Sequence, residues 1–251
     1  MARKPGHQDQ PPDQIHGHRS AGRIAGSEQV KFSIITIFPE LVRSFLNYGL
    51  LEKAIQKGLV EVEVHDLREF SRDKHRKVDD RPFSGGPGMV LMPDPLFRAV
   101  ESVKSRQDGR VILFSAYGRI LKQEKVKALA AADHLILICG RYEGVDQRAI
   151  DQLVDEEISL GEYVLMGGEI AAEALLEAVS RMIPGVVGNP ESVEGDSFFQ
   201  QDQFTFPQYT QPRTYRGLDV PEVLLSGHHK EIEQWRAKNR KTRRKKNEAN
   251  S

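Results

Sequence analysis

Short apolar runs alternate with segments of helical periodicity along most of this chain, and that alternation restricts the fold to one class. Runs rich in β-branched or other apolar residues predict strands at residues 30–38, 60–67, 111–115, 134–139, 155–159 and 163–166. Apolar side chains three and four positions apart predict helices at residues 39–55, 120–132 and 169–182. This order predicts an α/β domain with a mainly parallel sheet and helices on both faces.

Glycines gather in two clusters within residues 139–169, on either side of the apolar run at 163–166: Gly140, Gly144, Gly161, Gly167 and Gly168. Glycine at the end of a strand lets the backbone turn sharply or lets a ligand approach closely. Parallel sheets bind their ligands beyond the carboxyl ends of the strands. The stretch therefore predicts a ligand site built largely from main chain.

The sequence lacks the glycine motifs that bind the phosphates of nucleotides, and this disfavours a dinucleotide as the ligand. The first predicted strand ends in Phe38, Pro39 and Glu40, where a dinucleotide-binding protein would carry G-x-G-x-x-G, and no G-x-x-x-x-G-K-[ST] occurs elsewhere. Little positive charge except Arg141 lies beside the glycines to hold a pyrophosphate. A less anionic ligand is favoured, and a nicotinamide-dependent oxidoreductase is kept as a disfavoured alternative.

Charge and cysteine content bear on partners and compartment. The 251 residues include 36 Lys and Arg against 36 Asp and Glu, yet residues 236–246 hold eight cations and no anion. Such a run either attracts phosphate backbones or is a solvated tail, and charge alone leaves both readings open. One cysteine excludes an internal disulfide framework, and no apolar run is long enough to cross a bilayer. We expect a soluble cytoplasmic protein with no membrane partner.

Composition divides the chain into four parts. Residues 1–29 are poor in large apolar side chains and are expected to be a disordered extension. Residues 30–188 form the α/β domain, residues 189–207 are rich in turn formers and predict an interdomain linker, and residues 208–251 predict a small helical domain with a basic tail. Residues 68–92 form a long charged segment with little periodicity, which is typical of a functional or disordered loop.

Seven motifs occur together and in order: FPE, DDRPFSGGPGM, CGRYEGVDQR, LGEYVLMGGE, SRMIPGVVG, GDSF and VPEVLLSGHH. Together they resemble the bacterial tRNA (guanine-N1)-methyltransferase family, TrmD, of the SPOUT superfamily, from about residue 31 to about residue 235. Two positions depart from the family pattern, since Ala116 and Ala171 stand where relatives commonly have proline.

The resemblance implies S-adenosylmethionine as the methyl donor, guanine N1 at position 37 of tRNA as the acceptor, and an obligate homodimer. It also implies a trefoil knot on the carboxyl side of the α/β domain. Three loops of that knot would hold the donor, through Leu113, Ser115, Gly140, Tyr142, Gly144, Leu160, Gly161, Glu162, Tyr163, Val164, Leu165, Gly167 and Gly168.

Methyl transfer to guanine N1 needs a base, because N1 carries a proton, and a cation, because the resulting negative charge spreads to O6. The resemblance implies Asp196 as the general base and Arg181 as the group that stabilises charge on O6. Spacing alone leaves simpler roles open, a turn residue for Asp196 and a helix-end cation for Arg181. Because Asp196 lies in the linker, we expect it to be ordered when tRNA or the partner subunit covers the site.

Further contacts follow from the same resemblance. The loop with Asp80, Arg81 and Gly86 would lie near the target base, and Arg213, Arg216 and the basic tail would contact tRNA phosphates. Glu143 and Glu169 are candidates for Mg²⁺, with a solvated or helix-capping glutamate as the alternative for each. A non-catalytic RNA-binding module on the same fold is the second alternative function, disfavoured by the joint presence of Arg181 and Asp196.

Overall fold

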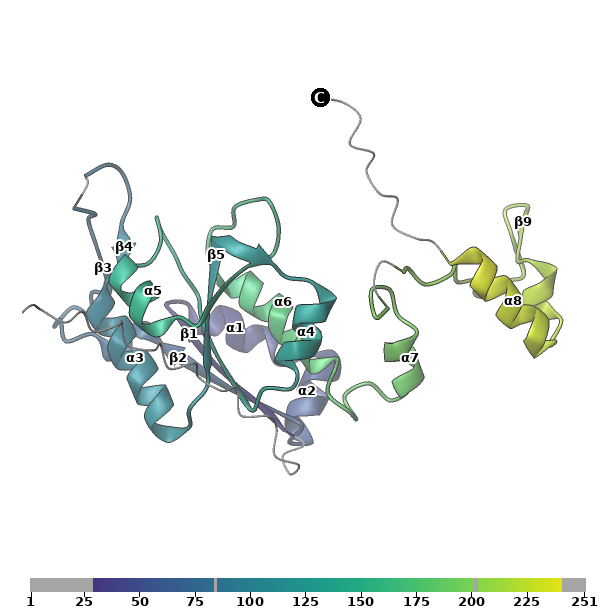
Figure 1. Ribbon diagram of the computed structural model, residues 1–251, viewed down its shortest axis with the longest axis horizontal. Coiled ribbons are helices and arrows are strands. Elements are labelled where there is room, and N and C mark those ends of the chain that lie inside the picture. The colour runs from purple at the N-terminus through teal and green to yellow at the C-terminus, as the bar shows by residue number, and fades with distance from the viewer. Residues whose placement is uncertain (1–28, 84, 201–202, 241–251) are drawn as a thin grey trace, which may run out of the picture.

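A five-stranded parallel sheet forms the centre of the molecule (Figure 1). The structure is a computed structural model that describes residues 29–83, 85–200 and 203–240, so the expectations for residues 1–28 and for the tail beyond residue 240 lie outside the described residues. The strand order is β2-β1-β6-β5-β7. The bounds are β1 Val30–Thr36, β2 Val60–Asp66, β5 Arg110–Ile120, β6 His134–Ile138 and β7 Glu156–Ser159. The predicted α/β class with a mainly parallel sheet is confirmed.

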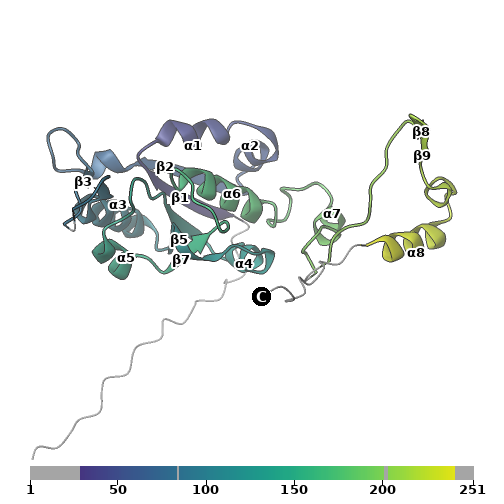
Figure 2. The same cartoon turned by 90° about the horizontal axis from the view of Figure 1, so that it is seen from above.

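Helices cover both faces of this sheet, as Figure 2 shows from above. One apolar cluster packs one face against α1 Pro39–Phe45, α2 Gly49–Gln56, α4 Gln123–Leu129 and α6 Glu169–Ser180. A second cluster packs the other face against α3 Pro93–Arg106 and α5 Gln147–Leu153. β6 is buried along its whole length, which explains why its run is apolar without alternation.

Several elements differ from the sequence prediction. The helix expected at residues 39–55 is two helices, and Gly49 at the start of the second has a φ of 73°. Ile120 belongs to β5, so the next helix begins only at Gln123. Helices α3 and α5 were not predicted. The long charged segment contains a 3-10 turn at Leu67–Phe70 and a two-residue ladder of β3 Asp79–Asp80 with β4 Val90–Leu91.

The strand predicted at residues 163–166 is wrong. These residues form an irregular loop between β7 and α6. Val164 is 88% exposed and Met166 is 91% exposed. An apolar run becomes a strand only where another strand pairs with it and a core covers it, and this run has neither in the described part of the chain.

Strand β5 meets β7 twice. Ile112, Leu113 and Phe114 pair with β7, the register is then interrupted, and Arg119 and Ile120 pair with the end of β7. Gly118 lies within this interruption, where an added Cβ would stand 2.5 Å from the backbone nitrogen of Ile158. This close approach places the interrupted part of β5 beside β7 and the loop that follows β7.

The carboxyl-terminal part is small and irregular. It comprises α7 Pro190–Glu194, β8 Thr214–Tyr215, β9 Leu218–Asp219, a 3-10 turn at Glu222–Leu225 and α8 His229–Asn239. Trp235 of α8 packs edge-on against Phe206 and Tyr209. Figure 1 shows α8 and β9 set apart from the sheet, beyond α7. Within the described residues, no helix has the length and apolar character needed to cross a membrane.

Candidate active site

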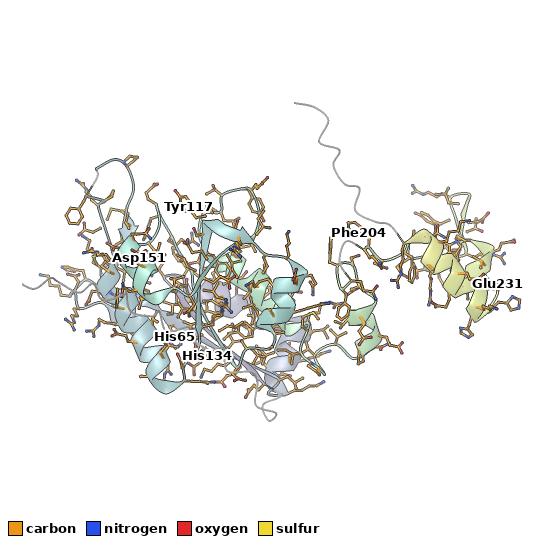
Figure 3. The ribbon with its side chains drawn as sticks, in the orientation of Figure 1. His65, Tyr117, His134, Asp151, Phe204 and Glu231 are labelled. Atoms are coloured by element: carbon orange, nitrogen blue, oxygen red, sulfur yellow. The ribbon has the colours of Figure 1, made fainter. Side chains whose placement is uncertain are left out.

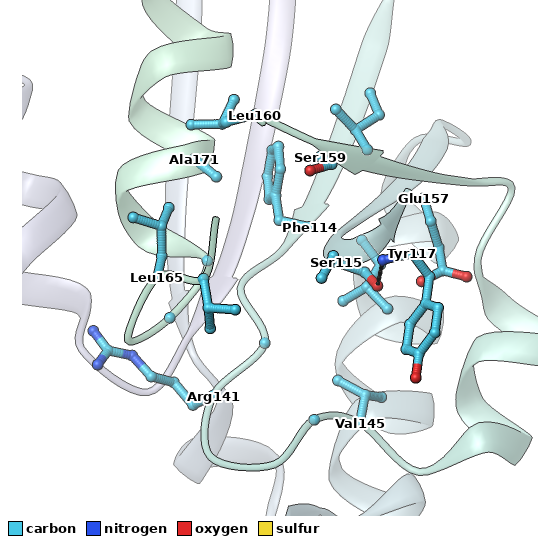
Figure 4. A pocket seen from close by; sticks show the side chains of 18 of the residues that line it. Phe114, Ser115, Tyr117, Arg141, Val145, Glu157, Ser159, Leu160, Leu165 and Ala171 are labelled. Atoms are coloured by element: carbon cyan, nitrogen blue, oxygen red, sulfur yellow. Dashed lines mark hydrogen bonds between the residues drawn. The ribbon is translucent and has the colours of Figure 1, made fainter. Parts of the chain in front are cut away.

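Residues 113–117 within β5 and the loops that follow β6 and β7 line a cavity of about 650 Å³ beside the carboxyl ends of β6 and β7 (Figure 4). The loops are joined through their backbones. The Gly168 N–H donates to the Gly140 carbonyl at 2.9 Å, and Arg141 forms a bridge with Gly167. The site therefore lies where a parallel sheet is expected to bind a ligand.

Most of the residues predicted to bind the donor line this cavity. They are Leu113, Ser115, Gly140, Tyr142, Gly144, Leu160, Tyr163, Val164, Leu165, Gly167 and Gly168. Gly161 and Glu162 do not line it; the Gly161 N–H donates instead to the Ser159 hydroxyl at 3.2 Å. Sequence reasoning missed several lining residues, among them Phe114, Ala116, Tyr117, Val145 and Glu157. Ala116 and Tyr117 belong to the S-A-Y-G turn, and that turn was the available signal.

The glycines of the cavity differ in how much space their neighbours leave for a side chain. A Cβ added at Gly168 would lie 2.8 Å from the Cα of Cys139, so this position requires glycine for close packing of two backbones. A Cβ added at Gly140 would instead lie 3.7 to 3.8 Å from atoms of Phe114, Val145 and Leu113, all of which line the cavity. Gly140 thus leaves space within the site, whereas Gly168 closes its wall.

Glu169 is fully buried at the start of α6 and links the strand ends to the loops. Its carboxylate accepts a hydrogen bond from the Thr36 hydroxyl at 2.7 Å and another from Arg141 Nε at 2.9 Å. The Arg141 guanidinium also donates to the Met166 carbonyl and lies 4.6 Å from the centre of the Phe38 ring. Arg141 therefore fixes the loop after β6 against the loop after β7.

These contacts bear on the proposed magnesium site. Both Glu169 oxygens already accept hydrogen bonds inside the protein, so Glu169 is not placed to bind a solvated ion. Glu143 lines the cavity and packs against Gly88. No group of three or more His, Cys, Asp or Glu side chains that could hold a metal occurs among the residues that the structure describes. One carboxylate does not make an oxygen-rich Mg²⁺ site.

The loop between β3 and β4 lies beside the cavity. The Glu143 N–H donates to the Met89 carbonyl at 2.9 Å, and the Leu91 N–H donates to the Gly144 carbonyl at 3.0 Å. On this loop Asp80 forms an ion pair with Lys77 at 2.9 Å, and that ammonium lowers the pKa of the Asp80 carboxyl. Arg81 is exposed and Gly86 has a φ of 100°. The segment that carries the predicted substrate-binding residues is thus attached, through Met89 and Leu91, to the loop after β6 that lines the cavity.

The two predicted catalytic residues contact each other. Arg181 Nε lies 3.2 Å from Asp196 Oδ2, and Arg181 Nη2 makes a second, shorter contact with the same oxygen. Both side chains are just over 40% exposed. Folding has joined residues that are 15 positions apart in sequence, and it leaves them open to solvent.

This pair lies far from the cavity of its own chain. Ala171 is the residue farthest along α6 that lines the cavity, while Arg181 follows the last residue of the same helix. At 1.5 Å of rise per residue, the ten positions from Ala171 to Arg181 span about 15 Å. Of the described residues, the cavity lining includes neither Arg181 nor Asp196.

Arg213 and Arg216 belong to the carboxyl-terminal part. The guanidinium of Arg213 lies 3.9 Å from the Glu222 carboxylate, and that of Arg216 lies 5.3 Å from the centre of the Tyr215 ring. Both side chains are exposed on or beside the β8–β9 hairpin. The structure does not bring them to the cavity.

A parallel α/β sheet, with a cavity lined by glycine loops and no phosphate-binding turn, fits the SPOUT class that the motifs predict. The comparisons with known proteins agree. Residues 30–250 match the model of the family described as tRNA (Guanine-1)-methyltransferase TrmD. The tRNA (guanine-N(1)-)-methyltransferase of Dictyoglomus turgidum is 49% identical over 209 residues, which cover 83% of this chain and 84% of the relative.

Two further relatives agree with this match. The tRNA (guanine-N(1)-)-methyltransferase of Thermus thermophilus is 49% identical over 207 residues, covering 82% of this chain and 85% of the relative. The crystal structure of the Aquifex aeolicus tRNA methyltransferase named for 1-methylguanosine at position 37 superposes with a TM-score of 0.70 at 44% identity, covering 82% of this chain and 87% of that one. The chain belongs to the TrmD family of tRNA (guanine-N1)-methyltransferases.

Proposed function

We propose that this protein transfers the methyl group of S-adenosylmethionine to N1 of the guanine at position 37 of tRNA, and that it does so in the cytoplasm as a homodimer. Membership of the family supports the reaction class. The observation that carries the mechanism is the contact between Arg181 and Asp196, because it unites the cation and the carboxylate that this chemistry requires.

The cavity fits the donor in size and character. Its volume of about 650 Å³ lies within the range of small-molecule sites, about 300–1,000 Å³. Amides and carbonyls of the glycine loops are suited to an adenine and to a methionine moiety, and Leu113, Leu160 and Leu165 offer apolar surface. When bound, S-adenosylmethionine supplies an electrophilic methyl group.

The protein groups then act on the acceptor. Asp196 accepts the proton from guanine N1, and Arg181 donates hydrogen bonds to O6, where the negative charge develops. The single cysteine does not take part, because Cys139 is buried and burial raises the pKa of its thiol. The transfer is therefore direct, without a covalent enzyme intermediate. Glu143 alone does not form a Mg²⁺ site, so no step of the proposed methyl transfer passes through that ion.

Distance supports the homodimer. Because the Arg181–Asp196 pair lies about 15 Å along α6 from the last cavity-lining residue of that helix, Ala171, we propose that each protomer presents this pair to the cavity of its partner. Exposed apolar side chains near the cavity support a protein interface there: Phe38, Leu41, Val164, Met166 and Ile170. The tRNA would contact the loop with Asp80, Arg81 and Gly86, and its phosphates would contact Arg213 and Arg216.

The decisive test is methylation of unmodified tRNA transcripts that carry either G or A at position 37, read by primer extension. Methylation of N1 blocks base pairing, so we expect a stop at position 37 for G and none for A. Asp196→Asn should lower the single-turnover rate about 10²- to 10⁴-fold while leaving S-adenosylmethionine binding unchanged. A protein that binds the transcript without producing the stop would instead be the RNA-binding module, and full activity of Asp196→Asn would refute the proposed base.

A further inference from the structure

The segment that carries Asp196 is folded. We call residues 195–200 and 203–205 the linker turn. The Thr205 N–H donates to the Ser197 hydroxyl at 3.0 Å, and the Phe198 N–H donates to the Gln203 carbonyl at 2.8 Å. The rings of Phe198 and Phe204 meet edge-on at 5.0 Å. Asp196 is therefore part of a compact unit, and its position depends on where that unit docks.

Among the residues that the structure describes, two side chains of the α/β domain form hydrogen bonds with the linker turn. One is Arg181, through Asp196. The other is Lys127 of α4, whose Nζ donates to the Phe199 carbonyl and lies 3.5 Å from the centre of the Phe199 ring. The Phe199 N–H in turn donates to the Asp196 carbonyl at 3.3 Å. Lys127 thus grips the linker turn three residues beyond the proposed base, by a charged hydrogen bond and a cation–π contact together.

Only one of these two contacts can persist unchanged during the reaction. Arg181 must turn its hydrogen bonds toward guanine O6, which weakens its contact with Asp196. Lys127 bonds a backbone carbonyl and an aromatic ring, neither of which takes part in the chemistry. Sequence alone does not indicate this role, because Lys127 follows Lys122, Glu124 and Lys125 in a charged segment and resembles ordinary surface charge.

We infer that Lys127 is a positioning residue, which docks the linker turn on α4 so that Asp196 is held in place for proton removal. This inference rests on the proposed role of Asp196. Lys127 does not touch substrate or donor; it acts through the Phe199 backbone and ring. Loss of the ammonium should therefore reduce the rate of methyl transfer and leave donor binding unchanged.

The test compares Lys127→Met, Lys127→Arg and Lys125→Met by single-turnover and steady-state methylation with the full-length protein and the G transcript. Methionine keeps much of the side-chain length without the charge, and arginine keeps both the positive charge and the ability to donate hydrogen bonds. Lys125 is a matched control on the same helix, because it pairs with Glu156 at 2.6 Å and not with the linker turn. We expect Lys127→Met to lower kcat about tenfold or more with an unchanged KM for S-adenosylmethionine, Lys127→Arg to recover most of the rate, and Lys125→Met to match the parent.

A double variant separates positioning from an independent effect. If Lys127 acts through Asp196, adding Lys127→Met to Asp196→Asn should cost little further rate, whereas independent effects would multiply. Parent-like kcat in Lys127→Met, or a fully multiplicative loss in the double variant, would overturn the inference. If Asp196→Asn is inactive and Lys127→Met is fully active, the role of Lys127 is refuted and the role of Asp196 as the base stands. A fully active Asp196→Asn removes the proposed base itself, so the two failures are distinguishable.

Discussion

Among single residues, Glu169 is the one on which the loops of the cavity most depend. It is fully buried and binds Thr36 and Arg141 at once. Removing one partner of a buried pair leaves the other charge poorly compensated, which costs more than the pair itself contributes. We expect Glu169→Gln to lower the free energy of unfolding by about 2–4 kcal/mol and to weaken S-adenosylmethionine binding, because Arg141 no longer fixes the loop.

Chemical denaturation and calorimetric titration measure these two effects. The control is Glu177→Gln, on an exposed position of the same helix, which should change the free energy of unfolding by less than about 0.5 kcal/mol. A parent-like free energy of unfolding and donor affinity for Glu169→Gln would show that the contact with Arg141 is dispensable.

The sequence predicted the glycines of the site and not its ion pair. Glycine at a strand end has a local physical meaning, so Gly140, which follows β6, could be assigned to a ligand site from its position. Gly167 and Gly168 also line the cavity, although the strand predicted before them is absent. The contact of Glu169 with Thr36 joins residues 133 positions apart, and no local pattern encodes it. For Glu169 the sequence offered a metal ligand or a solvated or capping glutamate, and the structure shows a buried partner of Arg141 at the start of a helix.

At the level of elements, the two-part pairing of β5 with β7 shapes the cavity and is consistent with the knot expected from the family. Gly118 has an ordinary φ, so its need for glycine is steric, set by the backbone of Ile158 at 2.5 Å. We expect Gly118→Ala to force β5 and β7 apart and lower Tm by about 5 °C or more, since a backbone clash at a strand crossing costs roughly 1–3 kcal/mol.

Gly140→Ala provides the comparison for this substitution. The added Cβ would make only ordinary contacts at 3.7 Å or more, so Tm should stay within about 2 °C of the parent. Thermal unfolding followed by circular dichroism measures both variants. Equal Tm values for the two would mean that β5 and β7 can separate without cost, against the packing described for Gly118.

Strands were predictable where both faces are buried, as in β1 and β6. Helices were less predictable, since α3, the longest helix in the described part of the chain, was missed although its apolar side chains form a buried stripe. The loop at residues 163–166 has the composition of a strand but is exposed in the single chain. An apolar run indicates that its side chains are buried, but it does not show whether a strand of the same chain or another protein buries them. In our proposal the partner protomer covers it.

At the scale of the whole molecule, the sequence indicates both halves of the proposed active site, and only the fold shows that they are apart. The motifs place the glycine loops from Gly140 onward and the pair of Arg181 and Asp196 within 60 residues of each other. Along α6, Arg181 then lies about 15 Å from Ala171, the farthest residue of that helix in the cavity lining. A single chain thus holds a cavity at one end of α6 and the proposed catalytic side chains at the other, and a symmetric dimer can unite them twice.

Mixed dimers test this arrangement. One subunit carries Asp196→Asn and keeps its donor cavity; the other carries Gly140→Val, whose branched side chain enters the space between Leu113, Phe114 and Val145, and keeps its catalytic pair. Each homodimer should be inactive. In the purified heterodimer the intact pair of one subunit serves the intact cavity of the other, so roughly half of the parent activity should return from one of two equivalent sites. If the pair served its own chain, both sites of the heterodimer would lack one component and no activity would return.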